Sequence, residues 1–414
     1  MTPTAPSERT RLDRAWREEG TRILGAVART TGDLLLAEDA VQEAFARAVE
    51  ETARGRAPDN PAAWITTVAR RVALDSLRRE RSAARATPAL AADIARAERA
   101  IADDAERGEE SVFTGDERLE LILLVAHPSL TAEARVELAL RFVCGLPTAR
   151  IAEVFLVSEP TMAARITRAK KRIHTSELRF VLDDPATVAD RMPDALTTIY
   201  LLYTIGHRTA DAALRRDAIA LARDAHRTAP GDESAGLLAL LLLTEARQAT
   251  RLTPGDEFTT LREADRTQWD SALIAEGERL AASALGGDGR YALQAGIAGL
   301  HATAPTWEAT DWPAIVRLYD GLVRQWPSPS ARLGRLVALG HSQDAGPEVG
   351  LAGLDADPGL FREPLTAQAH AARAELLRLE GRPREAASAL REAIGAAGDE
   401  RTARSLARLL AALE

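Results

Sequence analysis

The chain of 414 residues contains one cysteine, Cys144, and two lysines, Lys170 and Lys171. A single cysteine excludes an intramolecular disulfide, which is usual for a protein of a reducing compartment. The longest apolar run, residues 235–243, is far too short to span a bilayer. The first residues lack the hydrophobic core of a signal peptide. We therefore expect a cytoplasmic protein without a membrane segment.

Sequence motifs of the common enzyme classes are also absent. The seven histidines are scattered, and no His-x-x-x-His or Cys-x-x-Cys pair offers the spacing of a metal site. The sequence contains neither a glycine-rich phosphate loop nor a Gly-x-Ser-x-Gly turn for a nucleophile. His127, in VAHPSL, fits a helix end better than a catalytic base. The sequence therefore predicts a protein that is not an enzyme and needs no cofactor or metal.

What the chain does contain is an uneven distribution of charge. Residues 1–180 carry 28 basic and 28 acidic side chains, whereas residues 181–414 carry 25 and 33. Within the first part, residues 86–120 alone hold 4 basic and 10 acidic side chains. Two basic modules are thus joined by an acidic connector, and an acidic carboxy-terminal half follows them.

Helical periodicity dominates the chain, without a convincing strand alternation or hairpin turn. We therefore predict an all-α fold. Its four parts are a helical unit over 8–85, an acidic linker over 86–115, a second helical unit over 116–180 and a longer helical array over 181–414.

The array contains a weak repeat. Three segments share residues at offsets 0, 4, 7 and 12, and each ends on proline or glycine. They are Ala218, Ala222, Ala225 and Pro230; Ile315, Tyr319, Leu322 and Pro327; and Ala386, Leu390, Ala393 and Gly398. This spacing is typical of the second helix of a tetratricopeptide repeat (TPR). An ordinary helical domain without repeats is the alternative.

The clearest local motif is LPTARIAEVFLVSEPTMAARITRAKKRIH, residues 146–174. It predicts a short helix, a tight turn and a second helix that has Ser158 as its N-cap. Polar residues at the start of that helix and basic residues at its end are typical of a DNA-reading helix-turn-helix. The candidate DNA contacts are Ser158, Glu159, Thr161, Arg165, Arg168, Lys170, Lys171 and Arg172. Two packed helices with a solvated basic face are the alternative.

A second basic segment, residues 58–85, contains six arginines and only two acidic residues after its tryptophan. An aromatic ring can stack on unpaired bases, and guanidinium groups bind phosphates. The candidate nucleic-acid contacts are Trp64, Arg70, Arg71, Arg78 and Arg79. A core tryptophan beside a solvated arginine face explains the same residues at least as well.

A third segment, AEDAVQEAFARAVE (37–50), predicts a helix with an apolar stripe of Val41, Phe45 and Val49. Its other face places Asp39 and Glu43 on adjacent turns, which costs an isolated helix about 0.2–0.5 kcal/mol. This face could be a solvated surface or a docking surface for a basic partner.

The order of these elements resembles bacterial RNA polymerase sigma factors of the extracytoplasmic-function (ECF) group, which contain sigma domains two and four. Residues 37–45 resemble the family's core-binding helix, residues 60–79 its −10 reader and the helix-turn-helix its −35 reader. The resemblance implies that Asp39, Gln42 and Glu43 bind a basic coiled coil of core RNA polymerase. It implies that the two basic segments bind the −10 and −35 elements of promoter DNA, and that the linker runs through the RNA exit path.

The carboxy-terminal half refines this resemblance. Residues 264–277 and 289–322 resemble the subgroup that carries a fused TPR-like extension. Its negative charge beside two basic modules motivates the hypothesis that the extension contacts the sigma domains and regulates them in cis. The alternative is a DNA-binding transcriptional regulator with a helical-repeat sensor domain that is not a sigma subunit.

Overall fold

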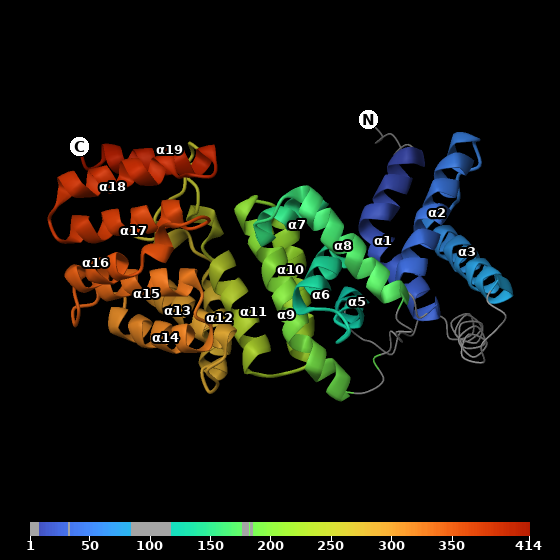
Figure 1. Ribbon diagram of the computed structural model, residues 1–414, viewed down its shortest axis with the longest axis horizontal. Helices are drawn as coiled ribbons and strands as arrows, with labels where there is room; N and C mark the ends of the chain where they lie inside the picture. The colour runs from blue at the N-terminus through green and yellow to red at the C-terminus, as the bar shows by residue number, and fades with distance from the viewer. Residues whose placement is uncertain (1–7, 32–33, 84–116, 176–181, 183–184) are drawn as a thin grey trace. The chain divides into compact units, whose positions relative to one another are not determined.

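In the computed structural model the chain is built from α-helices (Figure 1). The structure describes residues 8–31, 34–83, 117–175, 182 and 185–414. The predicted linker over 86–115 lies outside these residues. Within them, the extended structure is a single antiparallel bridge between Leu252 and Phe258. The prediction of an all-α fold is confirmed.

The helices of the described residues follow one another along the chain. The α-helices are α1 (Glu8–Thr31), α2 (Leu34–Ala53), α3 (Pro61–Ala83), α5 (Glu117–Val125), α6 (Ala132–Leu138), α7 (Thr148–Phe155), α8 (Glu159–Thr175), α9 (Pro185–Arg208), α10 (Ala212–Thr228), α11 (Asp232–Glu245), α12 (Ser271–Ala284), α13 (Arg290–Thr303), α14 (Trp312–Gln325), α15 (Pro329–His341), α16 (Pro347–Ala356), α17 (Thr366–Leu379), α18 (Pro383–Gly395) and α19 (Glu400–Ala411). A π-helix, η1 (Ala139–Val143), and three short 3₁₀ helices, η2 (Gln248–Thr250), η3 (Arg266–Gln268) and η4 (Pro358–Phe361), complete the set.

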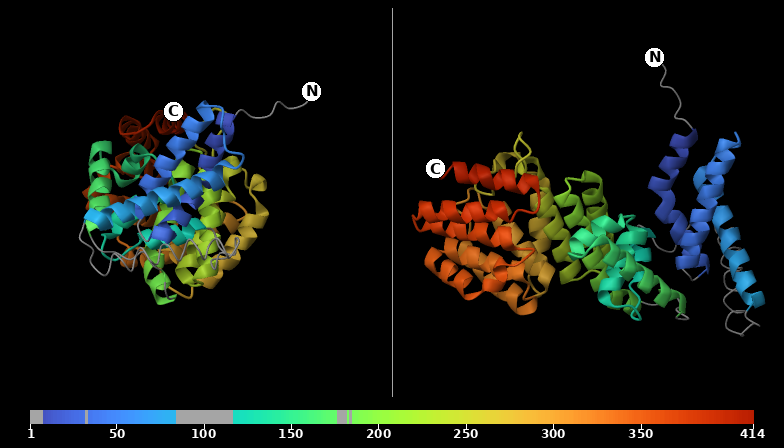
Figure 2. Two further views of the ribbon diagram at one scale, coloured as in Figure 1. Left: turned by 90° about the vertical axis from the view of Figure 1, so that its right-hand side faces the viewer. Right: turned by 45° about the horizontal axis from the view of Figure 1, so that its top comes forward.

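The chain forms two compact units, Met1–Ala229 and Pro230–Glu414. In the first unit α1, α2 and α3 pack against one another, and Figure 2 shows α1 and α2 side by side. The face that α2 buries consists mainly of alanines with Val41, whereas Val49 is 48% exposed. The predicted stripe of Val41, Phe45 and Val49 was therefore wrong at its last position, because small alanine side chains make the close contact between helices.

The first unit also contains a helix that is buried on all sides. In α5, Leu119 and every residue from Leu121 to Val125 are buried. Helices α1, α9 and α10 and the π-helix η1 all pack against it. Residues 185–228, which follow the helix-turn-helix in the chain, are thus part of the same compact unit as the helix-turn-helix.

The second unit is a succession of packed helices, and α17, α18 and α19 lie side by side in it (Figure 1). The predicted repeat positions Ile315, Leu322, Ala386, Leu390 and Ala393 are all buried. They lie on α14 and α18, and each of these helices ends shortly before the predicted proline or glycine. The spacing therefore identified correctly which helix faces are buried.

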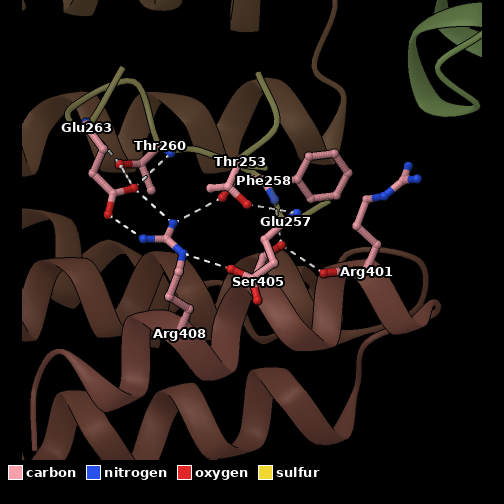
Figure 3. Close-up of polar contacts among 8 residues, drawn as sticks. All are labelled: Thr253, Glu257, Phe258, Thr260, Glu263, Arg401, Ser405 and Arg408. Atoms are coloured by element: carbon pink, nitrogen blue, oxygen red, sulfur yellow. Dashed lines mark hydrogen bonds and ion pairs between the residues drawn. The ribbon is translucent and has the colours of Figure 1, made fainter. Parts of the chain in front are cut away.

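The last helix, α19, is tied to a loop that precedes it by about 145 residues (Figure 3). Arg408 donates to Glu263 Oε1 at 2.7 Å and to the carbonyl oxygen of Phe258 at 3.1 Å. Ser405 Oγ accepts a hydrogen bond from the Phe258 amide at 2.7 Å, and Arg401 pairs with Asp256 at 3.0 Å. Hydrogen bonds from Arg408 and Thr260 lower the pKa of Glu263 to about 2. One face of α19 thus holds the loop, while Leu406 packs into the core.

A cluster of histidine and tryptophan rings lies inside the second unit. Trp312 packs edge-on against Trp307 at 4.9 Å and stacks on His341 at 4.4 Å. His301 lies against both tryptophans. Burial, followed by the charges of Arg247 and Arg266 and by His341, lowers the pKa of His301 to about 4. The cluster therefore holds His301 neutral in the folded chain.

The burial of His301 predicts a pH dependence of stability. Because the folded state binds the proton more weakly than the unfolded state, the second unit should lose stability as the pH falls from 6.5 to about 4. Between pH 7 and pH 4.5 the His301→Gln variant should reduce this loss by about 2 kcal/mol. Urea unfolding at pH 7 and pH 4.5 measures it, and equal pH dependence of the two proteins would contradict the prediction.

Candidate polymerase and nucleic-acid surfaces

The predicted polymerase-binding residues lie on the exposed side of α2. Asp39, Gln42 and Glu43 are exposed. Gln42 donates to Glu38 Oε1 at 3.0 Å, and Glu43 pairs with Arg47 at 3.0 Å. Asp39 has no partner among the residues that the structure describes. The face thus presents one free carboxylate beside an amide and a second, paired carboxylate.

The predicted −10 contacts lie on α3. This helix begins at Pro61 as predicted, and Asn60 Oδ1 accepts a hydrogen bond from the amide of Ala63 at 3.2 Å. Trp64 and two of the arginines recur every seven residues, so they lie along one side of the helix. The core is on the opposite side, at Ile65, Ala69, Ala73 and Leu77. Arg71, Arg78 and Arg79 are exposed, and Trp64 and Arg70 are half-buried.

The helix-turn-helix has the predicted geometry. α7 ends at Phe155, and its C-cap, Leu156, has a φ of 54°, which lies in the left-handed region and turns the chain sharply. Ser158 Oγ accepts a hydrogen bond from the Thr161 amide at 3.4 Å, so the predicted N-cap is confirmed. The predicted stripe of α8 is buried. It consists of Met162, Ile166, Ala169 and Ile173.

The predicted −35 contacts on α8 differ in their surroundings. Those that are exposed are Ser158, Glu159, Thr161, Arg168, Lys171 and Arg172. Arg165 is half-buried and donates to Glu137 Oε1 of α6 at 3.1 Å. Glu137 is only 2% exposed, and this burial raises its pKa, an effect that Arg165 opposes. Arg165 therefore joins α8 to α6, which restricts where its remaining N–H groups can point.

Lys170 is also engaged within the first unit. Its Nζ lies 2.5 Å from Glu38 Oε2 of α2 and 4.4 Å from the centre of the Phe142 ring. The predicted basic end of α8 and the predicted acidic face of α2 are thus in direct contact through these two residues.

Helix α9 is held on α5 and α6 by two arginines. Arg135 of α6 pairs with Asp194 of α9 at 2.6 Å. Arg191 of α9 is buried and donates to the carbonyl oxygen of Leu123 at 3.1 Å. Burial lowers the pKa of Arg191, and the charge of Arg135 lowers it further. Asp194 therefore offsets the charge of Arg135, whereas Arg191 is bound by a backbone carbonyl oxygen.

Comparison with known families matches the segments that contain these residues. The Sigma-70 region 2 family matches residues 16–83, which contain α2 and α3, and the Sigma-70 region 4 family matches residues 120–173, which contain the helix-turn-helix. The chain is 29% identical over 168 residues to the probable ECF RNA polymerase sigma factor SigI of Mycobacterium tuberculosis. That match covers 40% of this chain and 54% of SigI. The chain belongs to the sigma-70 family.

This sigma factor continues beyond region 4 into an extension. Residues 191–285 match a family of unknown function, DUF6596. An uncharacterised protein of Rhizobium meliloti (strain 1021) is 35% identical over 401 residues, which cover 93% of this chain and 92% of that protein. The crystal structure of the P58(IPK) TPR domain covers 90% of this chain and 98% of that structure at 13% identity, with a TM-score of 0.23. This TM-score is too low to establish a shared fold.

The sequence did not reveal two residues that the sigma factor uses to position region 4. Glu137 is an acid inside the apolar run VELAL, a position that could have indicated a buried partner for a basic residue of α8. Asp194 carries no comparable signal. Among the described residues, no group of three His, Cys, Asp or Glu side chains could hold a metal ion. Nor is any helix of this part long and apolar enough to cross a membrane.

The pair between Arg135 and Asp194 predicts a stability effect. Asp194→Ala leaves Arg135 without its carboxylate at low exposure, which should destabilise the first unit by about 1–3 kcal/mol. Asp190→Ala is the matched control, because Asp190 is exposed on the same helix. Thermal unfolding measures both. Equal melting temperatures of the two variants would show that the pair does not hold α9.

Proposed function

We propose that this sigma factor binds core RNA polymerase through Asp39, Gln42 and Glu43 and directs initiation at promoters with −10 and −35 elements. The observation that carries the proposal is the exposure of an acidic face on α2 and of basic side chains on α3 and α8, inside regions 2 and 4 of the family. Each surface matches the chemistry of its partner, because the face of α2 is acidic and the other two are basic.

The side chains of α3 and of α8 have different proposed roles on promoter DNA. Trp64 can stack on an unpaired base of the −10 element, while Arg70, Arg71, Arg78 and Arg79 bind the backbone. At the −35 element, the amino-terminal side chains of α8 reach base edges. They are Ser158, Glu159, Thr161, Arg165 and Arg168, and the phosphate contacts are Lys170, Lys171 and Arg172.

Transcription with purified components tests the proposal. Core polymerase plus this chain should start a transcript at a specific promoter. Asp39→Arg should lower its yield about tenfold or more, because a reversed charge repels a basic partner. Asp39 has no partner among the described residues, so the reversal breaks no internal ion pair. Asp190→Arg, which changes an exposed acidic residue of α9, is the control.

Two outcomes would contradict the proposal. If Asp39→Arg and Asp190→Arg have equal effects, the face of α2 is not the polymerase contact. If the chain binds promoter DNA but never starts a transcript with core polymerase, it is a DNA-binding regulator and not a sigma subunit.

We further propose that the extension regulates the sigma domains in cis. The ion pair between Arg135 and Asp194, and a second one between Arg118 and Asp217 at 3.2 Å, support a mechanical link between region 4 and α9 and α10. The segment that matches DUF6596, residues 191–285, contains α9 from Arg191 onward and all of α10. Through such a link, a conformational change in the extension displaces the −35 reader.

A truncated chain tests the regulation. A chain that ends at residue 229 keeps the first compact unit and lacks the second. Its transcript yield should differ from that of the full chain by about fivefold or more, which is the usual lower range of coupling between sites. Equal yields over a range of polymerase concentrations would contradict regulation in cis.

A further inference from the structure

The second unit contains a cavity of about 370 Å³, and none of the residues proposed to bind polymerase or DNA lines it. Its lining comes from α14, from α15 and from the carboxy-terminal end of α16. Helix α15 packs against both of the other helices. The volume is at the lower end of the range for small-molecule sites and has room for about a dozen water-sized groups.

Part of the wall of this cavity is apolar. Val323 of α14 and Leu336 of α15 line it, together with Gly353 of α16. A Cβ added at Gly353 would overlap Leu336 Cδ2, so glycine at this position leaves room for the leucine side chain. The wall can therefore contact the apolar part of a ligand.

The rest of the lining is charged, with an excess of cations. Three arginines line the cavity, Arg324 of α14 and Arg332 and Arg335 of α15. Two carboxylates line it as well, Asp320 of α14 and Asp357, which is the C-cap of α16. Three positive and two negative side chains leave one positive charge. The cavity thus attracts an anion, within a half of the chain that carries more acidic than basic side chains.

The two carboxylates engage only part of the guanidinium groups. Arg335 Nε donates to Asp320 Oδ1 at 2.6 Å. Arg332 Nε forms an ion pair with Asp357 Oδ2 at 3.3 Å, but it makes no hydrogen bond to the residues that the structure describes. Both pairs use Nε, and within the same part of the chain the terminal Nη groups of the two arginines donate no hydrogen bond. These groups stay available to a ligand.

Arg324 supplies the third cation. Its side chain is exposed, and it has no hydrogen bond or ion pair to any described residue. A guanidinium group can bind a carboxylate through two parallel N–H bonds. Arg324 therefore offers a complete fork for a carboxylate at the edge of a partly apolar cavity.

We propose that this cavity binds a small monocarboxylic acid, with the carboxylate at Arg324 and the apolar part against Val323 and Leu336. One carboxylate matches the single positive charge in excess, whereas a phosphate dianion would leave the site negative. The site goes beyond the proposed function and does not depend on it, because it lies in the second unit and uses none of the residues proposed for polymerase or DNA.

Titration of the full-length chain with sodium benzoate tests the site. Benzoate joins one carboxylate to an apolar ring, and saturation-transfer NMR at constant ionic strength measures its binding. Binding should saturate with a Kd of about 1 mM. Benzyl alcohol lacks the charge and inorganic phosphate lacks the apolar part, so each should bind at least about tenfold more weakly. No saturation by benzoate, or tighter binding of either control compound, would overturn the proposal.

The Arg324→Gln variant locates the binding. It should weaken benzoate binding about tenfold, because the carboxylate loses its charged fork. Arg317→Gln is the matched control, since Arg317 is exposed on the same helix, has no partner among the described residues and does not line the cavity. Equal affinities of the two variants would show that benzoate does not bind at Arg324.

The Asp320→Asn variant should have the opposite effect. It removes the carboxylate that competes with the ligand for Arg335, and it raises the excess charge of the cavity by one. Benzoate should then bind about three- to fivefold more tightly. Damage to the cavity cannot produce this gain. An unchanged or weaker affinity would overturn the role of the charge excess in the proposal.

Discussion

A helix whose apolar residues point in every direction has to be covered on all sides. In the first unit this helix is α5, in which Leu119 and all residues from Leu121 to Val125 are buried. Its cover comes from α1, η1, α9 and α10, which belong to region 2, region 4 and the extension. One nine-residue helix therefore brings three parts of the chain together, and the positions of the DNA-reading helices depend on how it is covered.

This constraint explains why the extension begins as part of the region 4 core. Without α9, apolar side chains of α5 would face water, and Arg135 would lose the carboxylate of Asp194. The hydrogen bond from Arg191 to the carbonyl oxygen of Leu123 ties the two backbones directly. A segment that completes a core in this way cannot move without changing the helices it covers. That is the physical basis for the proposed regulation in cis.

The sequence predicted the features that depend on local periodicity and capping. The buried stripe of α8, the N-cap Ser158 and the start of α3 at Pro61 all follow from residues within one or two helical turns. The buried repeat positions on α14 and α18 follow from the same reasoning. Periodicity states which face of a helix is buried, and says nothing about what covers it.

For that reason the long-range partners could not be predicted. Val49 continues the apolar spacing of α2 but is exposed, because alanines bring that helix close to its neighbours. Glu137 lies in an apolar run that is consistent with burial, but its spacing does not identify Arg165 as its partner. The contact of Lys170 with Glu38 joins residues 132 positions apart, a distance at which no spacing rule applies. The roles of the candidate site residues in binding polymerase and DNA stay predictions.

The balance of charge acquires a physical meaning from these pairs. Residues 1–180 carry equal numbers of basic and acidic side chains, so net charge alone would not draw them to DNA. Glu38 and Glu137 each neutralise a cation of α8, the first at Lys170 and the second at Arg165. One ammonium cannot pair with Glu38 and with a phosphate at once. The ion pair with Glu38 therefore competes with the phosphate contact proposed for Lys170.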